Sequence, residues 1–265
     1  MAAVTGLLRD RGARWVLGGW AFFTAENVVL SEYRAEIKQF WGGRGGQSAY
    51  QAFYSSASAL TLGTTYYAYY KFADTGVFYG PRPIWARLGA LACRAGGLVF
   101  ISQLLPPINY GAAGVALGLK ELPKEMSAEV RGALGCPFDF NAYKSRGEVF
   151  GITRVTRRPE MSGLGLVAMG GALLARTPTQ VCFFGIGPVI SFALLSLHID
   201  HTQRPSGELS PEKESQTSLT PFVALLDGRQ SWAALIEEAV PSNAWTAVAC
   251  AVLFGLRPSW MRLVK

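Results

Sequence analysis

Hydrophobic residues gather in long blocks along this chain, with polar connectors between them. The apolar blocks cover residues 15–30, 49–73, 84–105, 163–175, 181–197 and 243–256. A bilayer core about 30 Å thick needs roughly 20 apolar residues for each helical crossing, and each crossing must satisfy its own backbone hydrogen bonds. The pattern therefore predicts an all-α fold: a polytopic transmembrane helix bundle of about six spans, forming a single membrane domain over residues 1–265.

Residues 154–201 carry the clearest part of this pattern. Two nearly charge-free runs, 163–175 and 181–197, are joined by the five-residue break Arg176-Thr-Pro-Thr-Gln180. Two such runs with so short a break predict a membrane hairpin. Pro188 lies in the second run and is expected to kink it, because proline cannot donate a helical hydrogen bond.

The polar connectors between the apolar blocks are predicted to lie outside the membrane. Residues 108–162 form the longest extramembrane loop, and residues 120–134 within it are compatible with an amphipathic helix. Residues 202–220 are polar and predict a loop, and residues 231–240 predict a short interfacial helix. Gly89, Cys93 and Gly97 are four residues apart and predict a face on which another helix packs closely.

The composition is typical of a membrane protein and argues against nucleic acid as a partner. Half of the residues are hydrophobic, only 16% are charged, and the formal net charge is +7. Lys and Arg flank the apolar blocks and do not form a basic face with interleaved aromatics, so nucleic-acid binding is not expected. Residues 1–14 are interpreted as a basic flank of the first span, not as a cleaved leader. The four cysteines form no C-x-x-C pair and are interpreted as small hydrophobic residues.

Glu26 and Arg94 are ionisable residues inside apolar blocks, where charge is costly. The preferred interpretation is an intramembrane charged pair between the first and third spans, or charges that reach the interface at helix ends. A role in binding a proton or ligand, as in a transporter, is the alternative.

The only histidines, His198 and His201, are three residues apart and can share a helical face. They are candidate ligands for a metal or haem, although an interfacial role without a ligand is preferred because no third strong ligand lies nearby in sequence. No Walker loop, G-x-S-x-G or H-E-x-x-H motif is present, so no catalytic residue and no metal site are predicted.

Three stretches together resemble the NnrU family, which includes the plant and algal 15-cis-zeta-carotene isomerases. They are Gly45-Gly-Gln-Ser-Ala-Tyr-Gln-Ala-Phe-Tyr-Ser55, Gly151-Ile-Thr-Arg-Val-Thr-Arg-Arg-Pro159 and Thr217-Ser-Leu-Thr-Pro-Phe-Val-Ala-Leu-Leu-Asp-Gly-Arg229. The resemblance implies a helix bundle and, in the isomerases, a b-type haem held by histidines that isomerises a carotenoid double bond.

This chain departs from the family at its histidines. Arg158 stands where the motif's histidine belongs, Gly171 where the next helix would present one, and Glu26-Asn27 where the first span usually carries one. Haem iron needs a nitrogen, sulfur or phenolate axial ligand, which neither an arginine nor a glycine supplies. We therefore expect a divergent member without a cofactor, with haem b on His198 or His201 as the alternative.

The expected function is that of a non-catalytic accessory subunit of a larger membrane complex. The partners would be other membrane subunits and phospholipids, a bound phospholipid being the one small molecule expected, with Lys71, Arg157 and Arg158 at the lipid interface. The expected location is the mitochondrial inner membrane, in a respiratory-chain or ATP synthase complex; a plastid thylakoid or bacterial inner membrane is the alternative. The alternative function is a haem-dependent isomerase or a nitrogen-oxide-related NnrU-like protein.

Overall fold

The computed structural model describes residues 7, 9–41, 46–74, 79–116, 138 and 147–255. Within these ranges all regular structure is helical, and the β-type pairing is a single isolated bridge between Ile108 and Phe138. The all-α prediction is therefore confirmed for the described part of the chain. Contacts divide the chain into two units, of which the first contains residues 1–94 and 164–210 and the second residues 95–163 and 211–256.

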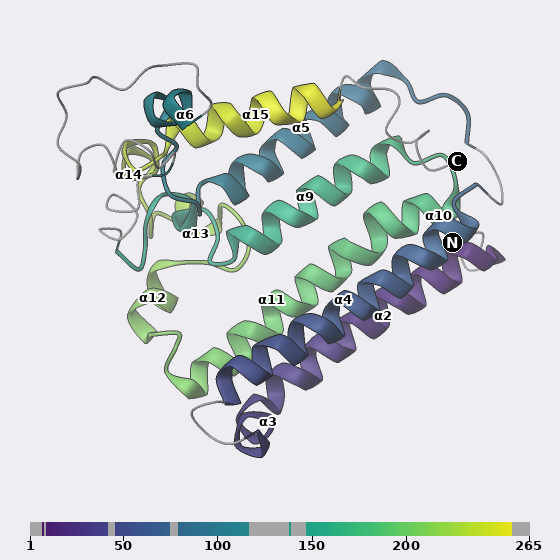
Figure 1. Cartoon of the computed structure of the whole chain (residues 1–265). Helices are drawn as coiled ribbons and strands as arrows, with labels where there is room; N and C mark the ends of the chain where they lie inside the picture. The colour runs from purple at the N-terminus through teal and green to yellow at the C-terminus, as the bar shows by residue number, and fades with distance from the viewer. Residues whose placement is uncertain are drawn as a thin grey trace. The chain divides into compact units, whose positions relative to one another are not determined.

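Three long helical segments build most of the first unit. They are α2 (Arg11–Glu32), which a short helix α3 (Arg34–Phe40) follows, α4 (Gly46–Phe72), and a continuous segment made of α10 (Pro178–Val181), η3 (Cys182–Ile186) and α11 (Gly187–Ser206). Figure 1 shows α2, α4 and α11 side by side. The Asp10 carboxylate accepts from the backbone N–H of Ala13 at 2.7 Å, so a side chain caps the start of α2.

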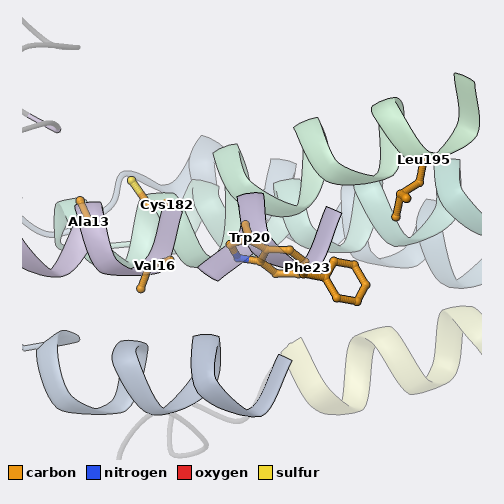
Figure 2. Close-up of a cluster of buried hydrophobic side chains, with 6 residues drawn as sticks. All are labelled: Ala13, Val16, Trp20, Phe23, Cys182 and Leu195. Atoms are coloured by element: carbon orange, nitrogen blue, oxygen red, sulfur yellow. The ribbon is translucent and has the colours of Figure 1, made fainter. Parts of the chain in front are cut away.

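The core of the first unit lies between α2 and the η3–α11 segment. Figure 2 shows its six buried members, Ala13, Val16, Trp20, Phe23, Cys182 and Leu195. Trp20 packs edge to face on Phe23, with ring centroids 5.7 Å apart. Beside this cluster the Thr24 hydroxyl donates to the Ser191 hydroxyl at 2.8 Å, which joins α2 to α11 through a buried hydrogen bond.

The turn of helix before Pro188 is widened. Residues Cys182–Ile186 form a π-helical turn between α10 and α11, and Pro188 lies in the first turn of α11. Proline has no N–H to donate to the carbonyl four residues earlier, so the helix locally relaxes its hydrogen-bond spacing. The sequence predicted a kink at Pro188, and the structure has a π-helical turn immediately before it.

Helices α5 (Ile84–Ser102) and α9 (Pro159–Leu174) each contribute to both units. In the first unit a Cβ on Gly170 would lie 2.7 Å from the carbonyl oxygen of Ala90, and one on Gly89 would meet Leu173. In the second unit a Cβ on Gly163 would lie 2.7 Å from the carbonyl oxygen of Gly97. The predicted small-residue face of α5 therefore packs against α9, where glycines allow close approach of the backbones.

Among its described residues, the second unit also contains six shorter elements. They are α6 (Tyr110–Ala116), η2 (Gly151–Arg154), α12 (Pro211–Gln216), α13 (Val223–Leu226), α14 (Trp232–Glu237) and α15 (Pro241–Gly255). Asn243 fixes the start of α15 against the end of α5. Its side-chain amide donates to the carbonyls of Ser102 and Leu105, and its side-chain oxygen accepts from the N–H of Ile108. These bonds satisfy carbonyls that the end of a helix leaves without intrahelical partners.

Each predicted span lies within or overlaps a helical segment of the structure, and the ends of the segments differ from the predicted ones. Two segments, residues 84–102 and 178–206, are long and apolar enough to cross a membrane, whereas α9 is apolar but has only 16 residues. The full six-span arrangement therefore stays a prediction. The fifth segment continues to Ser206, where the sequence predicted a loop, and ends at Gly207 with φ of 73°. The helix expected over residues 120–134 lies outside the described residues.

Candidate functional site

The second and third family-like stretches contact each other in the second unit. Most of residues 151–159 is buried, which is unusual for a connector containing three arginines. The N–H of Arg157 donates to the carbonyl of Ser218 at 2.7 Å, and the N–H of Phe222 donates to the carbonyl of Val155 at 2.8 Å. The two stretches therefore pair by backbone hydrogen bonds. We call residues 151–159 and 214–238 together the arginine junction.

Arg157 lies inside this junction with only 9% of its surface exposed. Its guanidinium donates to the hydroxyl of Thr217 at 3.0 Å, to the carbonyl of the same residue at 3.1 Å, and to the carbonyl of Glu214 at 3.2 Å. A buried cation is tolerated where hydrogen-bond acceptors surround it. Arg157 is thus a structural residue, which differs from the lipid-facing position expected from the sequence.

Arg154 contacts two residues, one at the end of α14 and one before its start. Its guanidinium makes a two-bond contact with the Glu238 carboxylate, at 2.9 Å from Nε and 2.5 Å from the second terminal nitrogen, and also donates to Gln230. The N–H of Gly151, whose φ is 37°, donates to the same carboxylate. Hydrogen bonding to Arg154 lowers the pKa of Glu238, and hydrogen bonding to Glu238 raises the pKa of Arg154. Both groups therefore stay charged near neutral pH.

Arg229 links the loop after α13 to the end of α12. Its guanidinium pairs with Asp227 at 2.7 Å and donates to the carbonyls of Ser215 and Thr217. Phe222, at the start of the helical turn α13, has a positive φ of 68°, which β-carbon-bearing residues rarely adopt. Hydrogen bonds on both sides of the turn hold this conformation. In the arginine junction the guanidinium groups of Arg154, Arg157 and Arg229 therefore all donate to acceptors within the protein.

Arg158 stands where the family motif has a histidine. The residue is half-buried, and its backbone N–H donates to the hydroxyl of Thr156 at 3.3 Å. Gly171, the second departure, is on α9, and a Cβ there would lie 2.8 Å from the side chain of Phe184. A histidine at that position would require the helices to separate.

Glu26 lies on α2 among hydroxyl groups of α4. Its carboxylate accepts from Ser58 at 3.3 Å and from the side-chain amide of Asn27 at 2.9 Å, and Thr61 lies 3.5 Å away. The Tyr54 hydroxyl donates to the side-chain oxygen of Asn27. In the described part of the chain no basic side chain pairs with this carboxylate.

Arg94 does not meet Glu26. Its half-buried side chain lies instead against α9, where its Cγ would be 2.8 Å from a Cβ on Gly170. The structure therefore places the two members of the suggested intramembrane pair against different helices. The long aliphatic part of an arginine is suited to such a position, because it packs on apolar surface.

The two histidines differ in their surroundings. The His198 ring nitrogen Nε2 lies 2.7 Å from the Ser31 hydroxyl and 4.0 Å from the Glu32 carboxylate, whereas His201 is exposed. Among the residues that the structure describes, no group of three or more His, Cys, Asp or Glu side chains is placed to hold a metal ion. The structure thus brings His198 to α2 and gives it a hydroxyl partner.

Glu238 and Gln230 are the junction residues that sequence reasoning missed. Neither belongs to a motif with a chemical signature, and their role depends on Arg154, which is 84 residues from Glu238. Lys71 lies at the end of α4, with its ammonium 5.8 Å from the centre of the Phe72 ring. It is exposed there, as a cation at the lipid interface would be.

Comparison with known proteins adds no relative: no family model, no curated protein and no solved structure matches this chain. The resemblance to the NnrU family therefore stays a prediction.

Proposed function

We propose that this chain is a non-catalytic integral-membrane protein that serves as an accessory subunit of a larger membrane complex. The observation that carries the proposal is the exposure of the two described segments that are long and apolar enough to cross a membrane. Only 17% of the apolar window in α5 is buried, and only 39% of that in residues 178–206. A core helix of a soluble protein of this hydropathy would be mostly buried, whereas a helix that faces lipid or another membrane subunit would not.

The sizes of the exposed and buried side chains also support a membrane environment. Large apolar residues are exposed on several helices, while many buried helix positions hold small or hydroxyl-bearing residues. The exposed set includes Trp15, Phe22, Leu60, Ile84, Trp85, Leu88, Ile190, Leu194, Trp245 and Leu253, and the buried set includes Ala13, Thr24, Thr61, Thr65, Ala86, Ala90 and Ser191. Membrane helices pack through small and hydroxyl-bearing residues, because large apolar side chains are as stable in contact with lipid as they are in the protein interior.

The hydrogen bonding of three arginines at the arginine junction favours a structural role for them over a catalytic one. Arg154, Arg157 and Arg229 all donate to acceptors within the protein. Such bonding links short helical turns and the loops between them into one connected element, of the kind that positions helices or presents a surface to other subunits. The mitochondrial inner membrane is the location we propose, with a respiratory-chain or ATP synthase complex as host.

Two measurements test the proposal. Carbonate washing of membranes should leave the protein in the membrane pellet, and release into the supernatant would contradict membrane embedding. Solubilisation of a tagged chain in mild detergent, followed by native electrophoresis and mass spectrometry, should show stable co-migrating membrane subunits of defined stoichiometry. A lone monomer at its own mass would contradict the role of subunit, and fractionation of mitochondria would test the proposed location.

A further inference from the structure

A groove of about 600 Å³ lies between α2 and α4 in the first unit. Its α2 wall is formed by residues spaced four, three and four positions apart, which places them on one helical face. Its α4 wall has the same kind of spacing. The lining residues include Arg11, Trp15, Gly18 and Phe22 on α2, and Tyr67 and Lys71 on α4. The groove is therefore a feature of two regular helices and not of a loop.

Two adjacent glycines explain why the groove exists. A Cβ on Gly19 would collide with the hydroxyl of Thr65, so α2 and α4 approach each other closely at Gly19. A Cβ on Gly18 would meet nothing within 4 Å, although Gly18 lines the groove. The missing side chain at Gly18 thus leaves open space next to a close helix contact.

One end of the groove is basic. Arg11 and Lys71 lie on the two walls, with their charged groups 5.7 and 5.8 Å from the centre of the same Phe72 ring. Both side chains are exposed, and within the described residues no carboxylate forms an ion pair with either. The neighbouring Asp10 carboxylate is used by the N–H of Ala13 and by the Thr179 hydroxyl. This end of the groove consequently favours an anion.

The rest of the groove is apolar and has the length of a lipid tail region. The aromatic rings of Trp15, Phe22 and Tyr67 line it and are more than half exposed. From Arg11 to Phe22 the helix rises about 16 Å, at about 1.5 Å per residue. Half of a hydrocarbon core of about 30 Å is about 15 Å. A molecule bound by its anionic end at Arg11 would therefore extend through one leaflet.

From this combination we propose that the α2–α4 groove binds an anionic phospholipid. Its phosphate would lie between Arg11 and Lys71, and one acyl chain would lie over Gly18 between the aromatic walls. Charge complementarity selects this occupant over a helix of another subunit, because two cations at one end and an uncharged apolar groove match an amphiphile with a single anionic head. The inference rests on the proposed membrane embedding, which the carbonate wash tests separately.

Filling the groove is the first test. Gly18→Leu puts a side chain into the open space, and leucine is a better helix former than glycine, so the variant should fold. Gly63→Leu is the matched control, since Gly63 lies on α4, has no neighbour within 4 Å of its Cβ position and does not line the groove. Both variants are purified in detergent micelles doped with phosphatidate or phosphatidylcholine of identical acyl chains, and bound lipid is counted by native mass spectrometry.

Removing the cations is the second test. We expect Arg11→Gln and Lys71→Gln each to weaken phosphatidate binding about fivefold, the usual contribution of one basic residue near an anionic head group. Phosphatidylcholine binding should change little. Arg14→Gln is the control, because Arg14 is an exposed cation on the same helix that does not line the groove.

The expected result is retention of one phosphatidate by wild type, Gly63→Leu and Arg14→Gln, with its loss in Gly18→Leu. Equal phosphatidate binding by Gly18→Leu and wild type would overturn the proposal, as would an unchanged lipid preference in the Arg11 and Lys71 variants. Loss of a co-purifying subunit in Gly18→Leu, with lipid binding intact, would show that a partner helix occupies the groove and would also overturn it. Circular dichroism of each variant separates these outcomes from misfolding.

Discussion

Arg154 and Glu238 form a two-bond ion pair although they are 84 residues apart in the sequence. The pair is partly shielded, with 18% of the Arg154 side chain and 37% of the Glu238 side chain exposed. The same carboxylate accepts from the N–H of Gly151, so it ties the start of η2 to the end of α14. Two fixed hydrogen bonds between charged groups are stronger than a single flexible surface contact.

Glu238→Gln should destabilise the protein by about 1 kcal/mol, because solvent screening reduces the stabilisation from a partly exposed pair. A change of that size corresponds to a fall of about 2–4 °C in the unfolding midpoint for a chain of this length. Thermal unfolding in detergent measures it. Glu237→Gln is the control, since the neighbouring carboxylate is exposed and makes no hydrogen bond in the described part of the chain. Equal midpoints for the two variants would refute the role of Glu238.

The stabilisation from this pair should depend on pH in the acidic range. Hydrogen bonding to Arg154 lowers the pKa of Glu238 from its ordinary value of 4.5 in the folded protein. A lowered folded-state pKa gives stability that is complete above the unfolded-state value and is lost as the pH falls through the folded-state value. The midpoint difference between wild type and Glu238→Gln should thus be constant near neutral pH and shrink below about pH 4.5. A difference that grows on acidification would contradict this sign.

Gly187 and Gly63 should respond in opposite directions to alanine. A Cβ on Gly187 would collide with the indole of Trp20 in the core between α2 and α11, whereas one on Gly63 would meet nothing. We expect Gly187→Ala to cost about 1–3 kcal/mol through overpacking. Gly63→Ala should gain about 0.4–1 kcal/mol by reducing the freedom of the unfolded chain. Unfolding midpoints of the two single variants check the prediction, and a stable Gly187→Ala protein would show that the core is looser than described.

The Thr24–Ser191 hydrogen bond should couple α2 to α11. A double-mutant cycle with Thr24→Ala and Ser191→Ala isolates this interaction. Hydrogen bonds between membrane helices average about 0.6 kcal/mol in such cycles, and we expect a coupling of that size. Additive effects of the two substitutions would mean that the hydroxyl groups do not interact.

Haem should not bind tightly to this protein. His198 already has the Ser31 hydroxyl within 2.7 Å of Nε2, and a histidine at the position of Gly171 would collide with Phe184. We expect no Soret band in the purified protein and none after incubation with haem. A Soret band that disappears in His198→Ala or His201→Ala would instead support the haem-dependent alternative and count against the non-catalytic role.

The sequence by itself determined where the long helices of this protein lie. Apolar blocks located the main helices to within several residues, and the spacing of Gly89, Cys93 and Gly97 identified the face of α5 that packs on α9. The sequence also indicated that the helix would be irregular near Pro188, because proline lacks the N–H that the preceding turn of helix would use. These signals are local: periodicity, proline and glycine act through a residue's immediate neighbours in the chain.

Only the tertiary structure decided which of the charged residues meet. It buried Arg157 among carbonyls, paired Arg154 with Glu238, and placed Glu26 beside Ser58 instead of Arg94. It also distinguished Gly18, which leaves a groove, from Gly19, which brings two helices together. The physical reason is that the role of a charged residue or of a glycine depends on the groups around it in the folded protein. Many of those groups are distant in the sequence, and only folding brings them within a few ångströms.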